Sequence, residues 1–97
     1  MATLKLRWLR RAERSLAKAA DHIAKENPAA AHRLIQRIRQ AGAEIAAYPE
    51  RGRAGRVPGT REFVVAGTAY IIPYRVRGDS VEIFHVLHTA RHWPDRL

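Results

Sequence analysis

The sequence predicts an α+β domain with the element order β-α-α-β-β-β, in which an N-terminal helical hairpin packs on a small, antiparallel-dominated sheet. Two observations predict this class. Apolar residues recur at helical spacing across residues 9–48, and at every second position in 61–65, 70–76 and 81–87. A chain of 97 residues suffices for one modest core, and a short sheet must bury one face against the hairpin. We therefore expect a single domain over residues 1–97.

The N-terminal part of the chain changes from a strand period to a helix period. Leu4, Leu6 and Trp8 alternate with basic residues, which predicts a short, half-buried strand. Beyond Trp8 the spacing becomes helical, and basic residues occupy the outer face. Asn27-Pro28 ends this helix and starts the next, with Asn as the N-cap and Pro at the first helical position. The apolar stripes comprise Ala12, Leu16, Ala19, Ala20 and Ile23 in the first helix and Ala31, Leu34, Ile38, Ala41, Ile45 and Tyr48 in the second.

Glycine and proline mark the end of the second helix and the loop that follows. Gly42 weakens the helix by about 1 kcal/mol relative to alanine, and Pro49 stops the pattern. Residues 49–60 contain three glycines interleaved with arginines, which predicts a mobile, solvated loop. A phosphate-binding loop is not indicated, because neither Lys-Ser/Thr nor a helix follows the glycines.

The C-terminal half alternates with a period of two in three segments. Arg61–Val65 predicts one strand, the residues from Tyr70 to Val76 a second, and those from Val81 to Leu87 a third. The expected core face of the second strand is Tyr70, Ile72, Tyr74 and Val76. Pro73 lies in the middle of that strand and has no N–H to donate, so we expect a bulge or an unpaired edge there.

Charge is the strongest compositional signal. Eighteen Lys and Arg residues against nine Asp and Glu give a formal net charge of +9, and arginine supplies most of it. Codon bias in a GC-rich genome is one explanation. A polyanionic partner, either nucleic acid or an acidic protein, is the explanation we favour, since so large an excess otherwise adds only self-repulsion.

Several classes of protein are disfavoured by what the sequence lacks. The chain has no cysteine, which excludes disulfides and thiolate metal sites. His88 and His92 have a metal-ligand spacing, but they fall at a strand end and in an irregular tail, so we expect no metal and no cofactor. No apolar run approaches the roughly 20 residues of a membrane span, and the N-terminus lacks the pattern of a secretory signal. We therefore expect a cytoplasmic protein.

One group of residues in the strands and the tail is a candidate functional site. If the strands pair as hairpins, several of these residues would gather near one edge of the sheet. Arginine and histidine together can hold a phosphodiester and move a proton, as a metal-free ribonuclease requires. They can equally clamp acidic side chains of a protein partner, or form a solvated face. The group comprises Arg61, Glu62, Arg75, His88, Arg91 and Trp93.

At these residues the sequence resembles the RelE/ParE superfamily of toxins, and within it the ParE branch. The resemblance runs across nearly the whole chain, from the N-terminal strand and helical hairpin to a final strand that ends in His and is followed by Arg and then Trp-Pro. The matching segments are Gly52-Arg53, Val57-Pro58-Gly59-Thr60-Arg61-Glu62-Phe63, Tyr70-Ile71-Ile72-Pro73-Tyr74-Arg75-Val76, Val81-Glu82-Ile83-Phe84-His85-Val86-Leu87-His88 and Thr89-Ala90-Arg91-His92-Trp93-Pro94.

This resemblance implies a RelE/ParE-like fold and the toxin component of a type II toxin–antitoxin system. A cognate antitoxin, acidic and partly disordered, would neutralise the toxin by wrapping a flexible segment around it. Operator DNA would be contacted only indirectly, through the antitoxin. A ParE-like toxin would inhibit DNA gyrase by direct binding without a catalytic residue, so that the six residues of the candidate site would bind partners.

A RelE-like, ribosome-dependent mRNA endoribonuclease is the alternative that the resemblance implies. His88 would then be the acid or base, and Arg61, Arg75 and Arg91 would hold the scissile phosphate. Thr89 beside His88 counts against cleavage, as does Tyr70-Ile71 where ribonuclease relatives place a phosphate-gripping arginine. A small RNA- or DNA-binding module is a third interpretation, and it ranks last because neither RNP-like aromatic spacing nor a helix-turn-helix signal is present.

Overall fold

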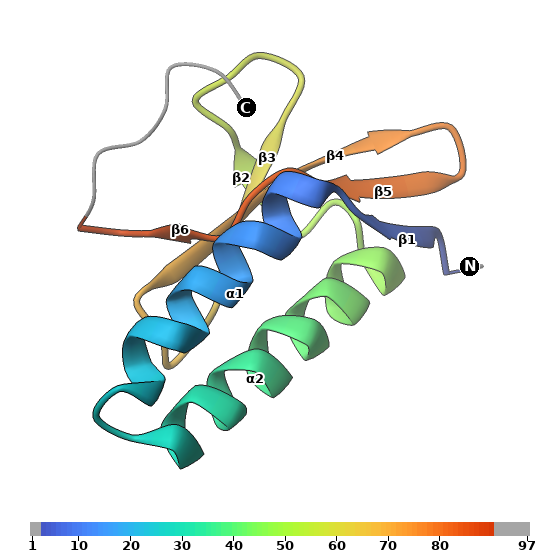
Figure 1. The fold of residues 1–97 in the computed structure, drawn as a ribbon. Helices are drawn as coiled ribbons and strands as arrows, with labels where there is room; N and C mark the ends of the chain where they lie inside the picture. Colours follow the sequence, from blue (N-terminus) through green and yellow to red (C-terminus); the bar gives the residue numbers. More distant parts are fainter. Residues whose placement is uncertain (1–2, 91–97) are drawn as a thin grey trace.

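The computed structural model describes residues 3–90, and within them the chain forms two layers, a helical hairpin on one face of a six-stranded sheet (Figure 1). The predicted fold class is confirmed, with two differences. A two-residue strand, β2, lies in the predicted loop, and the predicted last strand is divided into β5 and β6. The elements are β1 (Lys5–Trp8), α1 (Arg10–Ala24), α2 (Pro28–Ala47), β2 (Arg53–Ala54), β3 (Arg61–Val64), β4 (Tyr70–Arg77), β5 (Ser80–Ile83) and β6 (Leu87–His88).

The helical hairpin follows the predicted capping and stripes. The side chain of Asn27 accepts a hydrogen bond from Ala30 N at 3.1 Å, and Pro28 is the first residue of α2. This confirms the boundary predicted from Asn27-Pro28. Tyr48 departs from the predicted stripe, because α2 ends at Ala47 and the Tyr48 side chain turns outward, leaving the residue 57% exposed.

The sheet has the strand order β1-β5-β4-β3-β2, and β6 pairs with β4 beyond the end of β5. β1 is parallel to β5, with Leu6 beside Val81 and Trp8 beside Ile83, whereas the other pairs are antiparallel. The N-terminal strand therefore joins a strand that follows it by about 75 residues, and the two helices form the connection between β1 and the rest of the sheet.

The chain is bulged beside Pro73, as the sequence predicts. Tyr74 faces Ile83 and Ile71 faces Leu87, so the two residues between them on β4 oppose the three residues 84–86. Pro73 O accepts a hydrogen bond from Phe84 N at 3.0 Å. Because the N–H and C=O of one strand residue point to the same side, the position of the missing donor faces this bulge. On its other side Pro73 lies beside Glu62 of β3.

The core lies between the hairpin and the sheet. Its fully buried side chains include Ile38 and Ile45 of α2 and Ile72, Tyr74, Val81 and Ile83 of the sheet. Val76 departs from the predicted core face and is 46% exposed. The face of the sheet away from the helices carries the alternate residues, among them Glu62, Arg75 and Glu82.

Candidate functional site

The structure places Arg61 and Arg75 on opposite faces of the sheet. Arg61 lies beside Tyr74 in the β3–β4 register, on the helix side, and its Nη1 donates to Gly52 O at 2.8 Å and to Glu50 O at 3.3 Å. Arg75 follows Tyr74 directly, so its side chain leaves the other face. The predicted gathering of these two arginines is therefore wrong, because the strand register assigns them to different sides.

His88 lies on the helix side, but at the other end of β4. It pairs with Tyr70, and the two rings meet edge to face with centroids 5.2 Å apart. Its Nδ1 accepts a hydrogen bond from Ala90 N at 3.1 Å. Tyr70 and Tyr74 are four residues apart, which is roughly 13 Å along a strand, so His88 is distant from Arg61. The remaining cation and the aromatic residue of the predicted group, Arg91 and Trp93, lie outside the described residues.

Glu62 organises the arginine-rich loop from a buried position. Its Oε2 accepts from Arg56 N at 2.8 Å, and its Oε1 accepts from the Arg53 guanidinium at 3.3 and 3.4 Å. Tyr74 Oη adds a second anchor, donating to Pro49 O at 2.6 Å and accepting from Gly52 N at 2.9 Å. Burial raises the pKa of Tyr74 above its ordinary value. The segment predicted as a mobile, solvated loop is thus tied to the sheet at several points.

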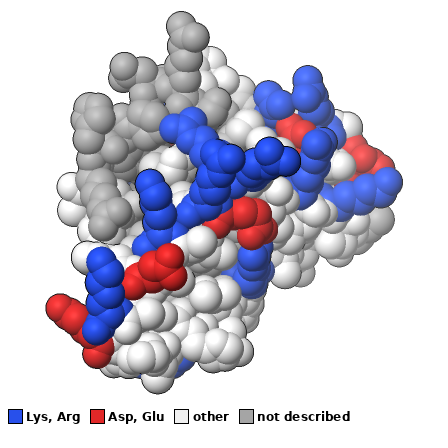
Figure 2. All heavy atoms as spheres, viewed as in Figure 1, with Lys and Arg blue, Asp and Glu red and all other residues white. Residues whose placement is uncertain are grey.

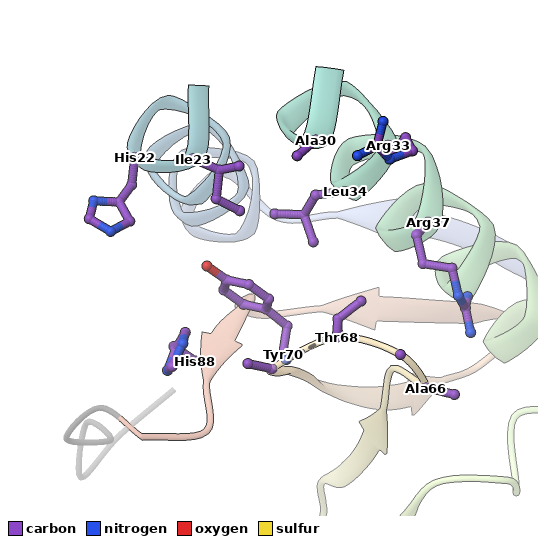
Figure 3. A pocket seen from close by; sticks show the side chains of 12 residues that line it. His22, Ile23, Ala30, Arg33, Leu34, Arg37, Ala66, Thr68, Tyr70 and His88 are labelled. Atoms are coloured by element: carbon purple, nitrogen blue, oxygen red, sulfur yellow. Dashed lines mark hydrogen bonds between the residues drawn. The ribbon is translucent and has the colours of Figure 1, made fainter. Parts of the chain in front are cut away.

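A cleft of about 620 Å³ opens between the helices and the β3–β4 turn, where α1 ends and α2 begins. Figure 3 shows Ile23 and Leu34 pointing from the helices toward the ring of Tyr70, which together make an apolar floor. Cationic and titratable side chains surround that floor, with His22 and His88 at one end and Arg33 and Arg37 at the other (Figure 3). Of the predicted site residues within 3–90, only His88 lines this cleft.

Arg37 gives the wall of this cleft an unmet hydrogen-bonding requirement. Its Nη1 is buried without a hydrogen-bond partner among residues 3–90, and the nearby Glu44 Oε1 is 3.8 Å away. A buried donor that lacks an acceptor costs free energy, and the Arg37–Glu44 ion pair offsets part of that cost. The sequence carried a signal for this site, since Arg33 and Arg37 are one helical turn apart and therefore share a face.

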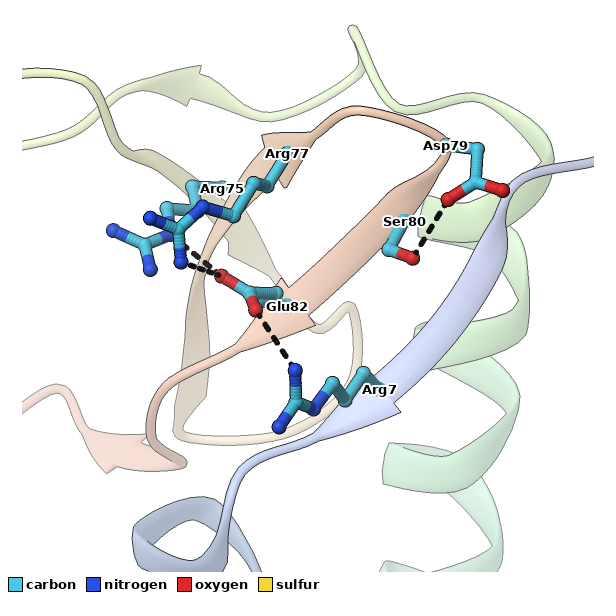
Figure 4. A network of polar contacts seen from close by, with 6 residues as sticks. All are labelled: Arg7, Arg75, Arg77, Asp79, Ser80 and Glu82. Atoms are coloured by element: carbon cyan, nitrogen blue, oxygen red, sulfur yellow. Dashed lines mark hydrogen bonds and ion pairs between the residues drawn. The ribbon is translucent and has the colours of Figure 1, made fainter.

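A second cluster of charges surrounds Glu82 on the face of the sheet away from the helices (Figure 4). Glu82 Oε1 accepts from Arg75 Nε at 2.7 Å, and Oε2 accepts from Arg7 Nη1 at 3.5 Å. Arg77 Nη1 lies 4.0 Å from Oε1. The hydrogen bond from Arg75 holds the pKa of Glu82 below its ordinary value. Sequence reasoning missed this cluster because only the parallel β1–β5 pairing brings Arg7 to Glu82.

The charged surface as a whole is predominantly basic. Figure 2 shows Lys and Arg side chains in a band over α1 and in a second group over the end of the sheet formed by β4, β5 and β1. Over the part of the chain that the structure describes, His, Asp and Glu side chains nowhere form a group of three that could hold a metal ion. Within the same residues, neither helix is long and apolar enough to cross a membrane.

Comparisons with known proteins agree with this fold. Residues 6–93 match the family model described as the ParE toxin of the type II toxin–antitoxin system parDE. The chain is 44% identical over 97 residues, the full length of both chains, to a Sinorhizobium fredii protein described as a toxin, Y4kP. It is 38% identical over 84 residues to toxin RelE2 of Caulobacter vibrioides, which covers 87% of this chain and 93% of the relative.

Two solved structures share the fold. A chain of the chromosomal ParDE toxin–antitoxin system of P. aeruginosa superimposes with a TM-score of 0.82 at 25% identity, over 89% of this chain and 96% of the other. A chain of the toxin–antitoxin complex RelBE2 of Mycobacterium tuberculosis superimposes with a TM-score of 0.65 at 24% identity, over 94% of this chain and 97% of the other.

Proposed function

Because the chain belongs to the ParE toxin family of type II toxin–antitoxin systems, we propose that it inhibits DNA gyrase by direct binding and is neutralised by a cognate antitoxin. The observation that carries the choice of a binding toxin over a nuclease is the separation of Arg61, Arg75 and His88. Cleavage of a phosphodiester needs an acid or base within hydrogen-bond reach of the phosphate that the cations hold. Arg75 lies on one face of the sheet, whereas Arg61 and His88 lie at opposite ends of the other.

The cleft at the end of the helical hairpin suits the neutralising segment of an acidic antitoxin. Its floor of Ile23, Leu34 and Tyr70 offers apolar surface to one side of a peptide, while Arg33 and Arg37 offer cations to carboxylates beside it. A peptide with alternating apolar and acidic side chains therefore complements this cleft.

The proposed gyrase activity is tested by supercoiling of relaxed plasmid. Purified toxin is added to gyrase, ATP and relaxed DNA, and antitoxin is then titrated back. We expect loss of supercoiling with trapped, cleaved DNA, both reversed by the antitoxin at equimolar ratio. Undisturbed supercoiling at a large excess of folded toxin would reject the gyrase target and turn attention to ribosome-dependent mRNA cleavage, where His88→Ala is the first variant to measure.

Antitoxin binding at the cleft is tested separately, by calorimetric titration of the toxin with its antitoxin. Arg33 is exposed on α2 and lines the cleft, so Arg33→Glu should weaken the complex at least tenfold through repulsion of the antitoxin's carboxylates. Arg14→Glu is the matched control, because Arg14 is also exposed and lies on α1 away from the cleft. Equal loss of affinity in the two variants would place the antitoxin elsewhere.

A further inference from the structure

The face of the sheet away from the helices holds two buried carboxylates, each among arginines. Glu62 and Glu82 are 3% and 4% exposed. The arginines around Glu82 are Arg7, Arg75 and Arg77, and those around Glu62 are Arg53 and Arg56. Five guanidinium groups against two carboxylates leave three positive charges on this face. The two glutamates therefore gather the arginines around them without neutralising them.

The strand register sets these arginines across the full width of the sheet. Arg7 of β1 and Arg75 of β4 flank Glu82 of β5, and Arg53 of β2 lies beside Glu62 of β3. From β1 to β2 there are four interstrand spacings, or roughly 19 Å. At 3.4 Å per step along one strand of a duplex, that width spans on the order of five phosphates.

Arg75 is held in an orientation suited to a second anion. Its Nε donates to Glu82 at 2.7 Å, and its guanidinium lies over the ring of Phe84 at 5.1 Å from the centroid. The edge that carries the two terminal nitrogens therefore points away from Glu82 (Figure 4). A guanidinium fixed through Nε and by stacking retains the planar fork that binds phosphate oxygens in pairs.

The flanking arginines are exposed and only loosely paired. The side chains of Arg7 and Arg77 are both 70% exposed, and they lie 3.5 and 4.0 Å from the Glu82 oxygens. Ion pairs of such exposed groups contribute little free energy. A polyanion arriving on this face can therefore recruit both guanidinium groups without breaking a strong internal contact.

We propose that this arginine face binds the sugar–phosphate backbone of duplex DNA, so that the toxin contacts the DNA as well as the enzyme; the choice of DNA rests on the proposed gyrase function. The chemistry of the face favours nucleic acid over an acidic protein. Protein interfaces centre on accessible apolar or aromatic anchors. Here the apolar neighbours Pro73 and Phe84 are buried, and Val64 at the end of β3, on the same face as Glu62, is 50% exposed but stands apart from the Glu82 cluster. DNA interfaces are more polar and more strongly positive, as this face is.

Binding is measured without gyrase or antitoxin, by fluorescence anisotropy of a labelled 20-base-pair duplex over a range of salt concentrations. Arg7→Gln with Arg77→Gln removes two charges from the face and leaves the Arg75–Glu82 hydrogen bond intact. We expect the affinity to fall at least tenfold at about 100 mM salt, and the slope of log K against log salt to decrease by about 1.8, the value for two lost phosphate contacts.

A control variant with the same change in net charge distinguishes binding at this face from general electrostatic attraction of the basic protein to DNA. Arg10→Gln with Arg14→Gln removes two exposed arginines from α1, on the helix side of the molecule. We expect less than a threefold change in affinity for this pair. The proposal would be overturned by equal losses of DNA affinity in the two double variants. It would also be overturned by no loss in the variant with Arg7→Gln and Arg77→Gln, called the sheet variant. Loss of binding to polyglutamate with unchanged duplex binding would do the same and assign the face to an acidic protein.

The same variants distinguish failure of this inference from failure of the proposed function. If the wild-type toxin inhibits gyrase and the sheet variant binds duplex DNA normally, the inference is wrong and the gyrase proposal stands. If duplex binding responds as expected and the wild-type toxin leaves supercoiling unchanged, the gyrase proposal is wrong and the DNA-binding face stands. Circular dichroism and thermal unfolding of each variant establish that the fold is intact.

Discussion

A Cβ atom at Gly42 would lie 2.5 Å from Cζ2 of Trp8, so the indole of β1 packs directly against the backbone of α2. Arg39, one turn earlier on α2, covers the same ring with its guanidinium 4.7 Å from the centroid. Arg39 is itself fixed by a two-pronged ion pair to Glu13 of α1, at 2.7 and 2.8 Å. Trp8 thus packs the first strand against α2, and Arg39 links that contact to α1.

Replacing Gly42 by alanine is expected to destabilise the domain, although alanine favours a helix. The helix gain is about 1 kcal/mol, whereas overpacking a buried contact costs about 1–3 kcal/mol. We expect a net loss of about 1 kcal/mol in the free energy of unfolding, measured by urea denaturation. In a Trp8→Leu background the indole is gone, so the same Gly42→Ala change should become neutral or stabilising. Stabilisation by Gly42→Ala in the wild-type background would contradict the packing described here.

Tyr74→Phe removes a hydroxyl that satisfies two backbone groups of the arginine-rich loop. Pro49 O would lose its donor and Gly52 N its acceptor. We expect a loss of about 2 kcal/mol in the free energy of unfolding, together with faster hydrogen exchange at Gly52. Tyr48→Phe is the control, because Tyr48 is exposed and its change should stay within about 0.5 kcal/mol. Similar effects for the two tyrosines would mean that the loop does not depend on Tyr74.

The contribution of Glu82 to stability is expected to depend on pH. Its pKa in the folded protein is below the ordinary value of 4.5, chiefly because of the hydrogen bond from Arg75. A carboxylate with a depressed pKa contributes stability that is present above the unfolded pKa and is lost as pH falls through the folded pKa. Wild type should therefore exceed Glu82→Gln in stability at pH 7, and the difference should shrink between pH 5 and pH 3. A difference that stays constant over this range would show that the charge of Glu82 contributes nothing.

Arg91 and Trp93 lie beyond the described residues and stay predicted partner-binding residues. Replacing both with alanine is expected to abolish growth inhibition when the toxin is induced without its antitoxin, because recognition would lose a cation and an aromatic anchor together. Thermal unfolding of the purified variant checks that the domain is folded. Full toxicity of a folded double variant would remove these residues from partner recognition.

The two-layer arrangement could be predicted because each segment with helical or alternating spacing is long enough to be distinctive. The stripes of α1 and α2 and the Asn27-Pro28 boundary depend on local spacing and capping, which the sequence states directly. Pro73 likewise predicted a bulge or an unpaired edge, since a missing donor interrupts the ladder of any antiparallel sheet, and the structure has the bulge. β2 was missed because two residues are too few to show a period, and its pairing with Arg61 and Glu62 of β3 is set by the strand register.

The candidate site was less predictable, because strand register decides which side chains meet. Alternation along the strand predicts that Arg75 and Tyr74 lie on opposite faces of the sheet. Only the β3–β4 register shows that Arg61 lies on the same face as Tyr74. A shift of one residue would have reversed that assignment. The contact of Arg7 with Glu82 depends in addition on a parallel pairing between the two ends of the chain, which no local pattern indicates.

The pairing of β1 with β5 also constrains when the protein can fold during its synthesis. β1 is synthesised before its partner strand β5, which follows by about 75 residues, or several seconds at roughly 5–20 residues per second. Until then the hairpin has no sheet to cover and Leu6 and Trp8 have no neighbouring strand. Closing so long a loop is slow compared with forming local contacts. A nascent toxin therefore cannot complete its sheet before β5 has been synthesised, which gives an antitoxin already present in the cell time to meet the toxin as it folds.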